Sequence, residues 1–305
     1  MRSPLQWLLR FKLLTLAAGG PLLLAATLSF VLVRPYVAGV PAEIPLQEIQ
    51  VGPSAQLEVI FDAYGYAWPP QGPLPRLAID RFPADIGTLE VMRKKALFFR
   101  GLLPLVEAEN ARIRAQRRFI EERFALGPLR PGTRNWNQVE RLAETYRVAG
   151  DLNDALVREI LLRRVDEVPA ALVLAQAANE SAWGTSRFAR EANNLFGLWT
   201  YKKDLGMVPA QRMEGARHYV RVFPDLRSSV RAYLHNLNAG HAYVELRHMR
   251  AAMRGAGALP DAAQLCDGLL RYSERGAEYV SEIRNMIGLN GLAQLGVPVL
   301  APPEP

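Results

Sequence analysis

The stretch LAQAANESAWGTS, residues 174–186, decides how the rest of the chain is interpreted. It predicts the second half of a helix that begins near Pro169, because proline suits the first helical turn. Residues 170–178 are almost entirely apolar, and Gly184 is a helix-termination signal. We therefore expect a helix that is buried on most sides and carries one carboxylate, Glu180, in its last turn.

Glu180 stands where a carboxylate does little for structure, because the negative end of the helix dipole repels it. The dipole and the apolar neighbours both favour a raised pKa, which a general acid needs near neutral pH. An exposed glutamate at a helix end explains this stretch equally well. The stretch alone leaves both interpretations open.

The charge of the chain is unevenly distributed. Its 305 residues have a formal net charge of +7, and residues 1–34 contribute four basic side chains and no acidic ones. The remaining mild excess of basic residues is compatible with a polyanionic wall or membrane surface. It is too small to indicate nucleic-acid binding, and no nucleic-acid motif is present. Nucleic acid is therefore not an expected partner.

Residues 13–33 form an uncharged apolar run of 21 residues, which matches the length that crosses a bilayer. A cleaved signal peptide has a shorter apolar core and a small-residue cleavage site, so we favour an uncleaved transmembrane anchor. Three basic residues precede the run and Arg34 alone follows it, which predicts a cytoplasmic segment at 1–12. We expect a single-pass protein of the inner membrane with its body in the periplasm.

The next part of the chain divides by composition. Prolines recur over residues 34–84, which predicts a semi-extended linker. Residues 85–164 predict a helical segment, in which Pro104 is expected to kink or split a helix over 88–126. Its basic cluster at 112–118 is expected to form a solvated face, or to contact anionic lipid or wall polymer.

Residues 165–291 predict a second helical body that includes a small β-ribbon, since HYVRVF (218–223) suits a short strand. Ser186 and Asp261 are expected helix N-caps. The proline-rich tail, 292–305, is expected to be loose. The fold class predicted from these patterns is mainly α.

Several common reactive arrangements are missing from the sequence. It has no glycine-rich phosphate loop, no paired-histidine zinc helix and no serine-centred hydrolase elbow. The four histidines are not spaced as a metal cluster, and the single cysteine, Cys266, is expected to be a small buried hydrophobe. We expect no metal and no cofactor. A carboxylate among aromatic residues favours glycoside cleavage, in which a proton donor acts beside rings that stack on sugars.

Three motifs carry a resemblance to a known family. ESAWGTS after an apolar helix, then NNLFGLW and RYSERGAEYVSEI, resemble the bacterial glucosaminidases (glycoside hydrolase family 73), and within them the membrane-anchored Bax-like branch. The resemblance covers about residues 165–290, with the motifs in the family's order. It implies a lysozyme-like helical domain with a small β-lobe over 165–291. It also implies peptidoglycan glycan strands as the partner.

The resemblance also implies residue roles. By position, Glu180 is the general acid that protonates the glycosidic oxygen, and Tyr272 is the tyrosine that faces it. Four further residues are expected to line or support the substrate cleft: Trp183, Asn194, Phe196 and Tyr279. Core and loop packing explains Trp183, Asn194 and Phe196 as well as substrate contact does. Tyr279 is a weaker cleft candidate, and packing of the final helix also explains it.

The second catalytic group is less defined. Glu214 is the best positional candidate for a second acid, followed by Asp204 and Glu191. Alternatively, the acetamido group of the substrate assists the reaction itself. The leading function is an endo-β-N-acetylglucosaminidase. A lytic transglycosylase that cleaves after N-acetylmuramic acid and a non-catalytic wall-binding scaffold are the alternatives, since E-S-x-W-G also occurs in transglycosylases.

Overall fold

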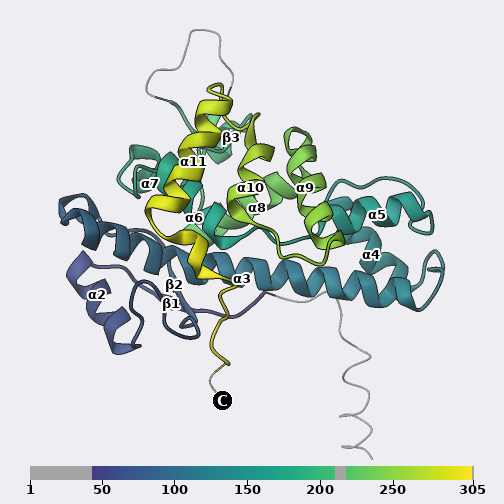
Figure 1. Ribbon diagram of the computed structural model, residues 1–305, viewed down its shortest axis with the longest axis horizontal. Helices are drawn as coiled ribbons and strands as arrows, with labels where there is room; N and C mark the ends of the chain where they lie inside the picture. The colour runs from purple at the N-terminus through teal and green to yellow at the C-terminus, as the bar shows by residue number, and fades with distance from the viewer. Residues whose placement is uncertain (1–42, 210–217, 304–305) are drawn as a thin grey trace, which may run out of the picture. The chain divides into compact units, whose positions relative to one another are not determined.

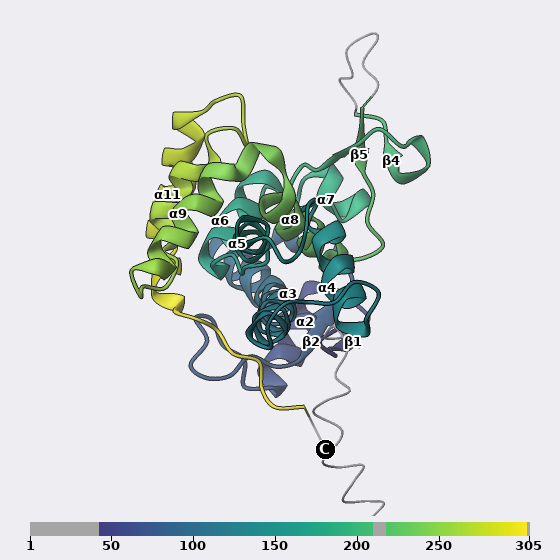
Figure 2. The same cartoon turned by 90° about the vertical axis from the view of Figure 1, so that its right-hand side faces the viewer.

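A long helix, α3 (Val91–Ala125), runs through the computed structural model, and other elements pack on both of its sides (Figure 1). The structure describes residues 43–209 and 218–303. Figure 2 shows α3 almost end-on, with α2 (Ser54–Ala63), β1 (Gln47–Ile49) and β2 (Leu77–Ile79) on one side. The helices that carry the predicted site lie on the other side.

The remaining elements complete a mainly helical architecture. The other α-helices are α4 (Arg134–Thr145), α5 (Ala155–Arg164), α6 (Ala170–Glu180), α7 (Arg187–Ala192), α8 (Leu226–Ala239), α9 (Val244–Gly255), α10 (Ala262–Leu265) and α11 (Ala277–Leu289). The 3-10 helices are η2 (Ile86–Thr88), η3 (Lys203–Leu205), η4 (His241–Tyr243), η5 (Cys266–Leu269) and η6 (Leu292–Leu295). Strands β1 and β2 pair in parallel, while β3 (Trp199–Thr200), β5 (Tyr219–Arg221) and β4 (Gly206–Met207) form an antiparallel sheet in the order β3-β5-β4. The predicted mainly helical chain with small sheets is confirmed.

Helix α3 is continuous through Pro104, so the expected split does not occur. The side chain of Glu90 caps its start by accepting from the backbone N–H of Met92 at 2.8 Å and of Arg93 at 3.2 Å. Residues 97–110 are all buried, and α3 packs against α6 and α8. The free energy gained by burying this apolar surface exceeds the cost of the one backbone hydrogen bond that a proline removes from a helix.

The basic cluster at 112–118 is partly buried in ion pairs instead of forming a solvated face. Arg112 pairs with buried Glu109 at 2.9 Å, and Arg114 pairs with buried Glu107 and with Glu167. Glu107 and Glu109 belong to α3 itself, whereas Glu167 belongs to the segment that leads into α6. The cluster therefore joins α3 to that segment, and only Arg118 among its arginines is fully exposed.

The proline-rich stretch before α3 is ordered from residue 43 onward. It holds β1, α2 and β2, and it buries Leu57, Phe61 and Ile79 in contact with α3. The tail is also held, because Leu74 donates to the carbonyl of Val299 and accepts from the N–H of Ala301, both at 2.8 Å. The described residues belong to one compact unit. Apolar residues scattered between prolines supply the buried surface that a free linker would lack.

The predicted anchor at 13–33 and the predicted cytoplasmic segment at 1–12 lie outside the described residues. Within residues 43–209 and 218–303, no helix has both the length and the apolar character needed to cross a bilayer. The anchor therefore stays a prediction.

Helix α6 lies in the core, and its packing positions Glu180. Residues Ala170 to Ala178 are all buried, and the helix contacts α3, α10 and α11. At its entrance the Asn110 amide donates to the carbonyl of Val168 at 2.8 Å and accepts from its N–H at 3.1 Å. Both ends of the Asn110 amide are thus used to fix where α6 begins.

Candidate active site

Glu180 is the last residue of α6, and its side chain is half-buried. Burial raises the pKa of its carboxyl above the ordinary value of 4.5. Hydrogen bonds from Tyr279 and Asn179 and the charge of Arg275 act in the opposite direction, while the charge of Glu282 adds to the increase. The net direction is the one expected from the sequence. The raised pKa favours the protonated form, which is the form that a general acid delivers.

Tyr279 makes the direct contact with Glu180. Its hydroxyl donates to the Glu180 carboxylate and accepts a hydrogen bond from Gln176 Nε2 at 2.8 Å. The other end of the Gln176 amide, Oε1, accepts from the hydroxyl of Tyr233. Gln176, Tyr233 and Tyr279 all have an exposed fraction of 0%. The acid is therefore backed by a buried chain of hydrogen bonds.

Tyr272 lies one layer behind this contact. Its ring stacks on that of Tyr279, with centroids 5.3 Å apart and planes 4° apart, and its hydroxyl donates to the carbonyl of Phe196 at 2.8 Å. Burial, the neighbouring tyrosines and the charge of Glu180 raise the pKa of Tyr272 well above its ordinary range. The structure thus brings both predicted tyrosines to the acid, with Tyr279 in the nearer position.

The turn after α6 has an unusual backbone. Ala182 (φ 49°), Trp183 (φ 59°) and Gly184 (φ 80°) all adopt the left-handed region, which is costly for residues with a Cβ atom. A Cβ atom on Gly184 would come within 3.0 Å of the Phe82 ring, so a glycine is needed there. The ring of Trp183 packs edge-on against Phe99 at 5.2 Å. The strained turn places a half-buried tryptophan three residues after the acid.

The NNLFGLW loop passes beside the carboxylate. Asn194 is buried and ties the loop down, because its Nδ2 donates to the carbonyls of Leu198 and Arg221 at 2.8 Å. Phe196 is buried and stacks on Tyr233, with ring centroids 4.0 Å apart. A Cβ atom on exposed Gly197 (φ 63°) would lie 3.8 Å from Glu180 Oε2. The loop therefore leaves the acid open to solvent at a glycine.

Among the described residues, the candidates for a second acid do not form a cluster with Glu180. Glu214 lies outside them. Glu191 is exposed and pairs with Arg187 at 2.9 Å, and Asp204 is exposed in η3. The other carboxylate whose charge reaches Glu180 is Glu282 of α11, which pairs with Arg275 at 2.6 Å.

Sequence reasoning missed Gln176, Tyr233, Glu282 and Arg275. The sequence did contain a sign of Gln176, because it is a polar residue in an otherwise apolar helix. It also stands four residues before Glu180, on the same helix face. Nothing in the sequence pointed to Tyr233, since a tyrosine on an amphipathic helix is an ordinary core residue. The contact between α8 and α6 exists only in the folded chain.

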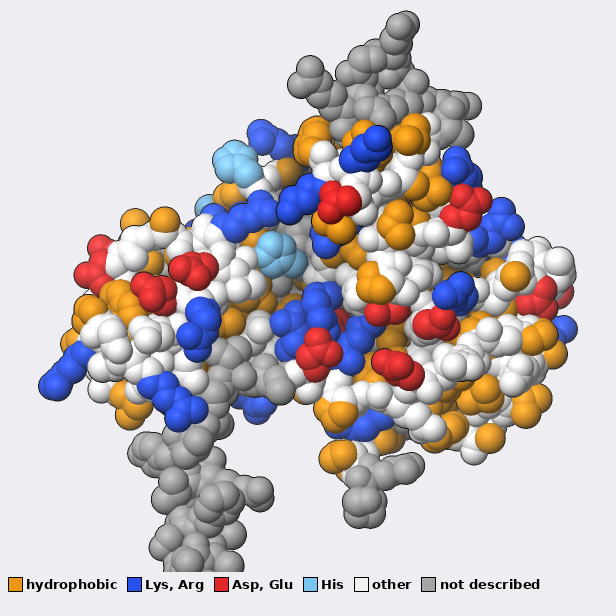
Figure 3. Space-filling model, turned by 180° about the vertical axis from the view of Figure 1, so that it is seen from behind, with side chains coloured by type: hydrophobic (Ala, Val, Ile, Leu, Met, Phe, Trp, Pro, Cys, Tyr) orange, Lys and Arg blue, Asp and Glu red, His pale blue; other side chains and the backbone are white. Residues whose placement is uncertain are grey.

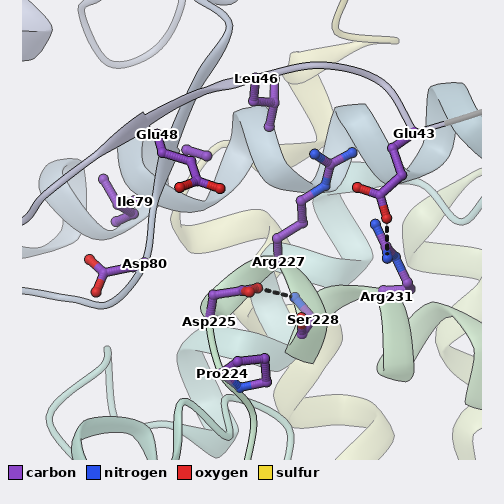
Figure 4. Close-up of a pocket in the computed structure, with 11 residues that line it drawn as sticks. Glu43, Leu46, Glu48, Ile79, Asp80, Pro224, Asp225, Arg227, Ser228 and Arg231 are labelled. Atoms are coloured by element: carbon purple, nitrogen blue, oxygen red, sulfur yellow. Dashed lines mark hydrogen bonds and ion pairs between the residues drawn. The ribbon is translucent and has the colours of Figure 1, made fainter.

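One cavity of the described residues lies beside the site, and another lies apart from it. One, of about 600 Å³, is lined by Trp183, Lys95 and residues of α11. Lys95 Nζ lies 4.9 Å from the centroid of the Trp183 ring. The other, of about 400 Å³, contains none of the predicted site residues, and its Arg231 is paired with Glu43 at 2.6 Å (Figure 4).

Charged side chains of both signs are mixed on the face that Figure 3 shows, and the described residues hold no cluster of metal ligands. On the face opposite to that of Figure 1, basic and acidic side chains lie next to one another (Figure 3). No group of three or more His, Cys, Asp or Glu within residues 43–209 and 218–303 is arranged to hold a metal ion. Cys266 is buried as predicted, and burial raises the pKa of its thiol to about 12.

The chain is similar to known proteins over the region that carries Glu180. The glucosaminidase family model, described as mannosyl-glycoprotein endo-beta-N-acetylglucosaminidase, matches residues 160–292. The chain is also 35% identical over 188 residues to protein bax of Escherichia coli (strain K12). Residues 160–292 therefore form a glucosaminidase-family domain, in a chain that is similar to protein bax. The match covers 61% of the chain and 66% of protein bax, slightly less than two thirds of that relative. No solved structure matches the chain significantly.

The glucosaminidase region contains Glu180, Tyr272 and Tyr279 but not α3. Yet α3 supplies Phe99 and Lys95 against the ring of Trp183. In this chain, the candidate site is thus supported by a helix from outside the matched region.

Proposed function

We propose that the chain hydrolyses peptidoglycan as an endo-β-N-acetylglucosaminidase, cleaving the bond after N-acetylglucosamine with Glu180 as the general acid. The observation that supports this most is the half-buried Glu180 carboxyl, whose pKa is raised while Tyr279 donates to it. The acid holds its proton in the free site and gives it to the glycosidic oxygen as the bond breaks. Membership of the glucosaminidase family supports the reaction class.

The tyrosines support the acid in this proposal. The donated hydrogen bond of Tyr279 stabilises the carboxylate that Glu180 becomes after it loses its proton. Tyr272 holds the Tyr279 ring through the stacked contact and fixes the loop through the carbonyl of Phe196.

The substrate strand is proposed to lie along the open side of the acid. Trp183 offers an aromatic face for a sugar ring, and so does Trp199, which is 61% exposed on the β-lobe. Asn194 and Phe196 contribute indirectly, by holding in place the loop that lies beside the substrate. The second group is either Glu214 or the acetamido group of the substrate itself.

Placement in the cell completes the proposal. The apolar run at 13–33 anchors the chain in the inner membrane, and the glucosaminidase domain at 165–291 acts in the periplasm. The ordered residues from 43 onward then belong to the body that acts on the wall. No metal, cofactor or nucleic acid takes part.

The test is to incubate the purified full-length chain with peptidoglycan and to determine the fragments by mass. Fragments with a reducing N-acetylglucosamine end are expected. Glu180→Gln should release none, while Glu159→Gln, which removes an exposed carboxylate on α5, should act like the wild type. Full activity of Glu180→Gln would contradict the proposal. A 1,6-anhydro-muramoyl end would indicate a lytic transglycosylase, and wall binding without release would indicate a scaffold.

A further inference from the structure

The hydrogen-bond chain behind Glu180 has a direction. The Tyr233 hydroxyl donates to Gln176 Oε1, Gln176 Nε2 donates to the Tyr279 hydroxyl at 2.8 Å, and the Tyr279 hydroxyl donates to Glu180. Each donor meets an acceptor, and the three side chains behind the acid are fully buried. The order of donors therefore runs from Tyr233 on α8 to Glu180 at the end of α6.

The direction depends on the Gln176 amide, because an amide accepts at its oxygen and donates at its nitrogen. If the amide turned over, Oε1 would face Tyr279 and take the hydroxyl proton that now goes to Glu180. The amide nitrogen would then face Tyr233, whose hydroxyl proton would lose its present acceptor. A buried donor without an acceptor is strongly unfavourable. The Tyr233 hydroxyl therefore opposes the turned state.

We propose that Tyr233 is a positioning residue for Glu180: its hydroxyl fixes the orientation of the Gln176 amide, and that amide commits the Tyr279 proton to the Glu180 carboxylate. The catalytic meaning of this inference rests on the proposed function, but the hydrogen bonds themselves do not depend on a substrate. Tyr233 lies in α8 and does not touch Glu180 through a hydrogen bond of its own.

Other charged and titratable groups also act on the Glu180 carboxyl, and a test must leave them in place. Tyr279, Asn179, Arg275 and Glu282 act on the pKa of Glu180, and the charge of Glu180 in turn raises the pKa of Tyr233, Tyr243 and Tyr272. Tyr233→Phe removes one hydroxyl from this set. It keeps the ring that stacks on Phe196 and leaves the charges of Arg275 and Glu282 unchanged. A change at Glu180 then reports on the hydrogen-bond chain.

The fold offers a matched control. Tyr146 is also buried, with an exposed fraction of 3%, and its hydroxyl donates to Gln116 Oε1 at 2.8 Å. The charge of Glu180 does not contribute to the pKa of Tyr146. Tyr146→Phe thus breaks the same kind of buried tyrosine–glutamine hydrogen bond without acting on the acid.

The pKa of Glu180 is measured by NMR on the full-length chain with ¹³C-labelled glutamate carboxyls, and Glu180→Gln assigns the resonance. We expect Tyr233→Phe to raise this pKa by about one unit, the effect of one lost hydrogen bond to the charged form. Gln176→Leu, which removes the amide that could take the Tyr279 proton, should not raise it, and neither should Tyr146→Phe. The alkaline limb of the kcat/KM profile on peptidoglycan should move with it.

Each outcome is decisive. An unchanged Glu180 pKa in folded Tyr233→Phe overturns the inference, and so does an equal shift in Gln176→Leu or in Tyr146→Phe. A shifted pKa in a protein that cleaves no glycan overturns the proposed function and supports the hydrogen-bond chain.

Discussion

The hydroxyl of Tyr279 on α11 donates a hydrogen bond to the carboxylate of Glu180 at the end of α6. This contact joins the ESAWG motif to the YVSEI motif, which are far apart in the sequence. The other tyrosine of the late motif, Tyr272, supports Tyr279 by stacking on its ring. Two opposing effects thus act on the pKa of Glu180: burial raises it, and the hydrogen bond from Tyr279 lowers it.

Two charges beside the acid predict opposite pH shifts. Glu282→Gln removes a negative charge that raises the pKa of Glu180, so the alkaline limb of the kcat/KM profile should move to lower pH. Arg275→Gln removes a positive charge that lowers this pKa, so the limb should move to higher pH. Both profiles are measured against Glu159→Gln, which should match the wild type. Shifts of the same sign would contradict this electrostatic account.

Gly197 is predicted to be needed for activity as well as for stability. Gly197→Ala forces an alanine to φ 63° and places its Cβ 3.8 Å from Glu180 Oε2. Gly65→Ala imposes the same backbone strain at φ 62°, with no atom within 4 Å of the new Cβ. Thermal unfolding should show a loss of about 1–2 kcal/mol in both variants. Peptidoglycan cleavage should fall about tenfold in Gly197→Ala only, and an equal fall in both would refute a local effect.

Trp199 is predicted to bind substrate. Its side chain is 61% exposed on the β-lobe and stacks on His218, with ring centroids 4.1 Å apart. Trp199→Ala should weaken binding to peptidoglycan about tenfold in a sedimentation assay, with little change in melting temperature. Tyr64→Ala removes another exposed aromatic side chain, at the end of α2, and should leave binding unchanged. Equal binding by both variants would remove Trp199 from the site.

Glu109 is predicted to make stability depend on acid pH. Burial alone would raise its pKa, but hydrogen bonds and charges from Arg231, Arg112 and Arg227 lower it to about 2. In the folded state it therefore binds fewer protons than in the unfolded state between about pH 5 and pH 2. Its contribution to stability is present above this window and is lost as the pH falls through it.

The corresponding variant is Glu109→Gln, which removes the carboxylate that three arginines share. Arg231 keeps its pair with Glu43, while Arg112 and Arg227 lose their carboxylate. The variant should destabilise the chain by about 3–5 kcal/mol at neutral pH and flatten the fall in melting temperature on acidification. Glu121→Gln removes an exposed carboxylate from the same helix and should change neither. A Glu109→Gln protein with the wild-type pH dependence would show that Glu109 is not the group responsible.

The sequence by itself determined the features that depend on neighbouring residues. Ser186 and Asp261 cap their helices as predicted, by accepting from the N–H groups of Ala189 at 3.2 Å and Gln264 at 2.8 Å. The end of α6 at Glu180 also follows from local signals. A cap, a turn or an apolar period acts within a few residues, so it can be read without the fold.

Only the tertiary structure decided which distant side chains meet. It placed Tyr279 rather than Tyr272 on the carboxylate, brought Tyr233 to Gln176, and drew α3 against Trp183. It also ordered the proline-rich stretch, which was expected to be a semi-extended linker, and the tail, which was expected to be loose. These outcomes depend on burial and hydrogen bonding between segments that are far apart in the chain. Local patterns do not contain that information, because packing competes with and outweighs local propensity.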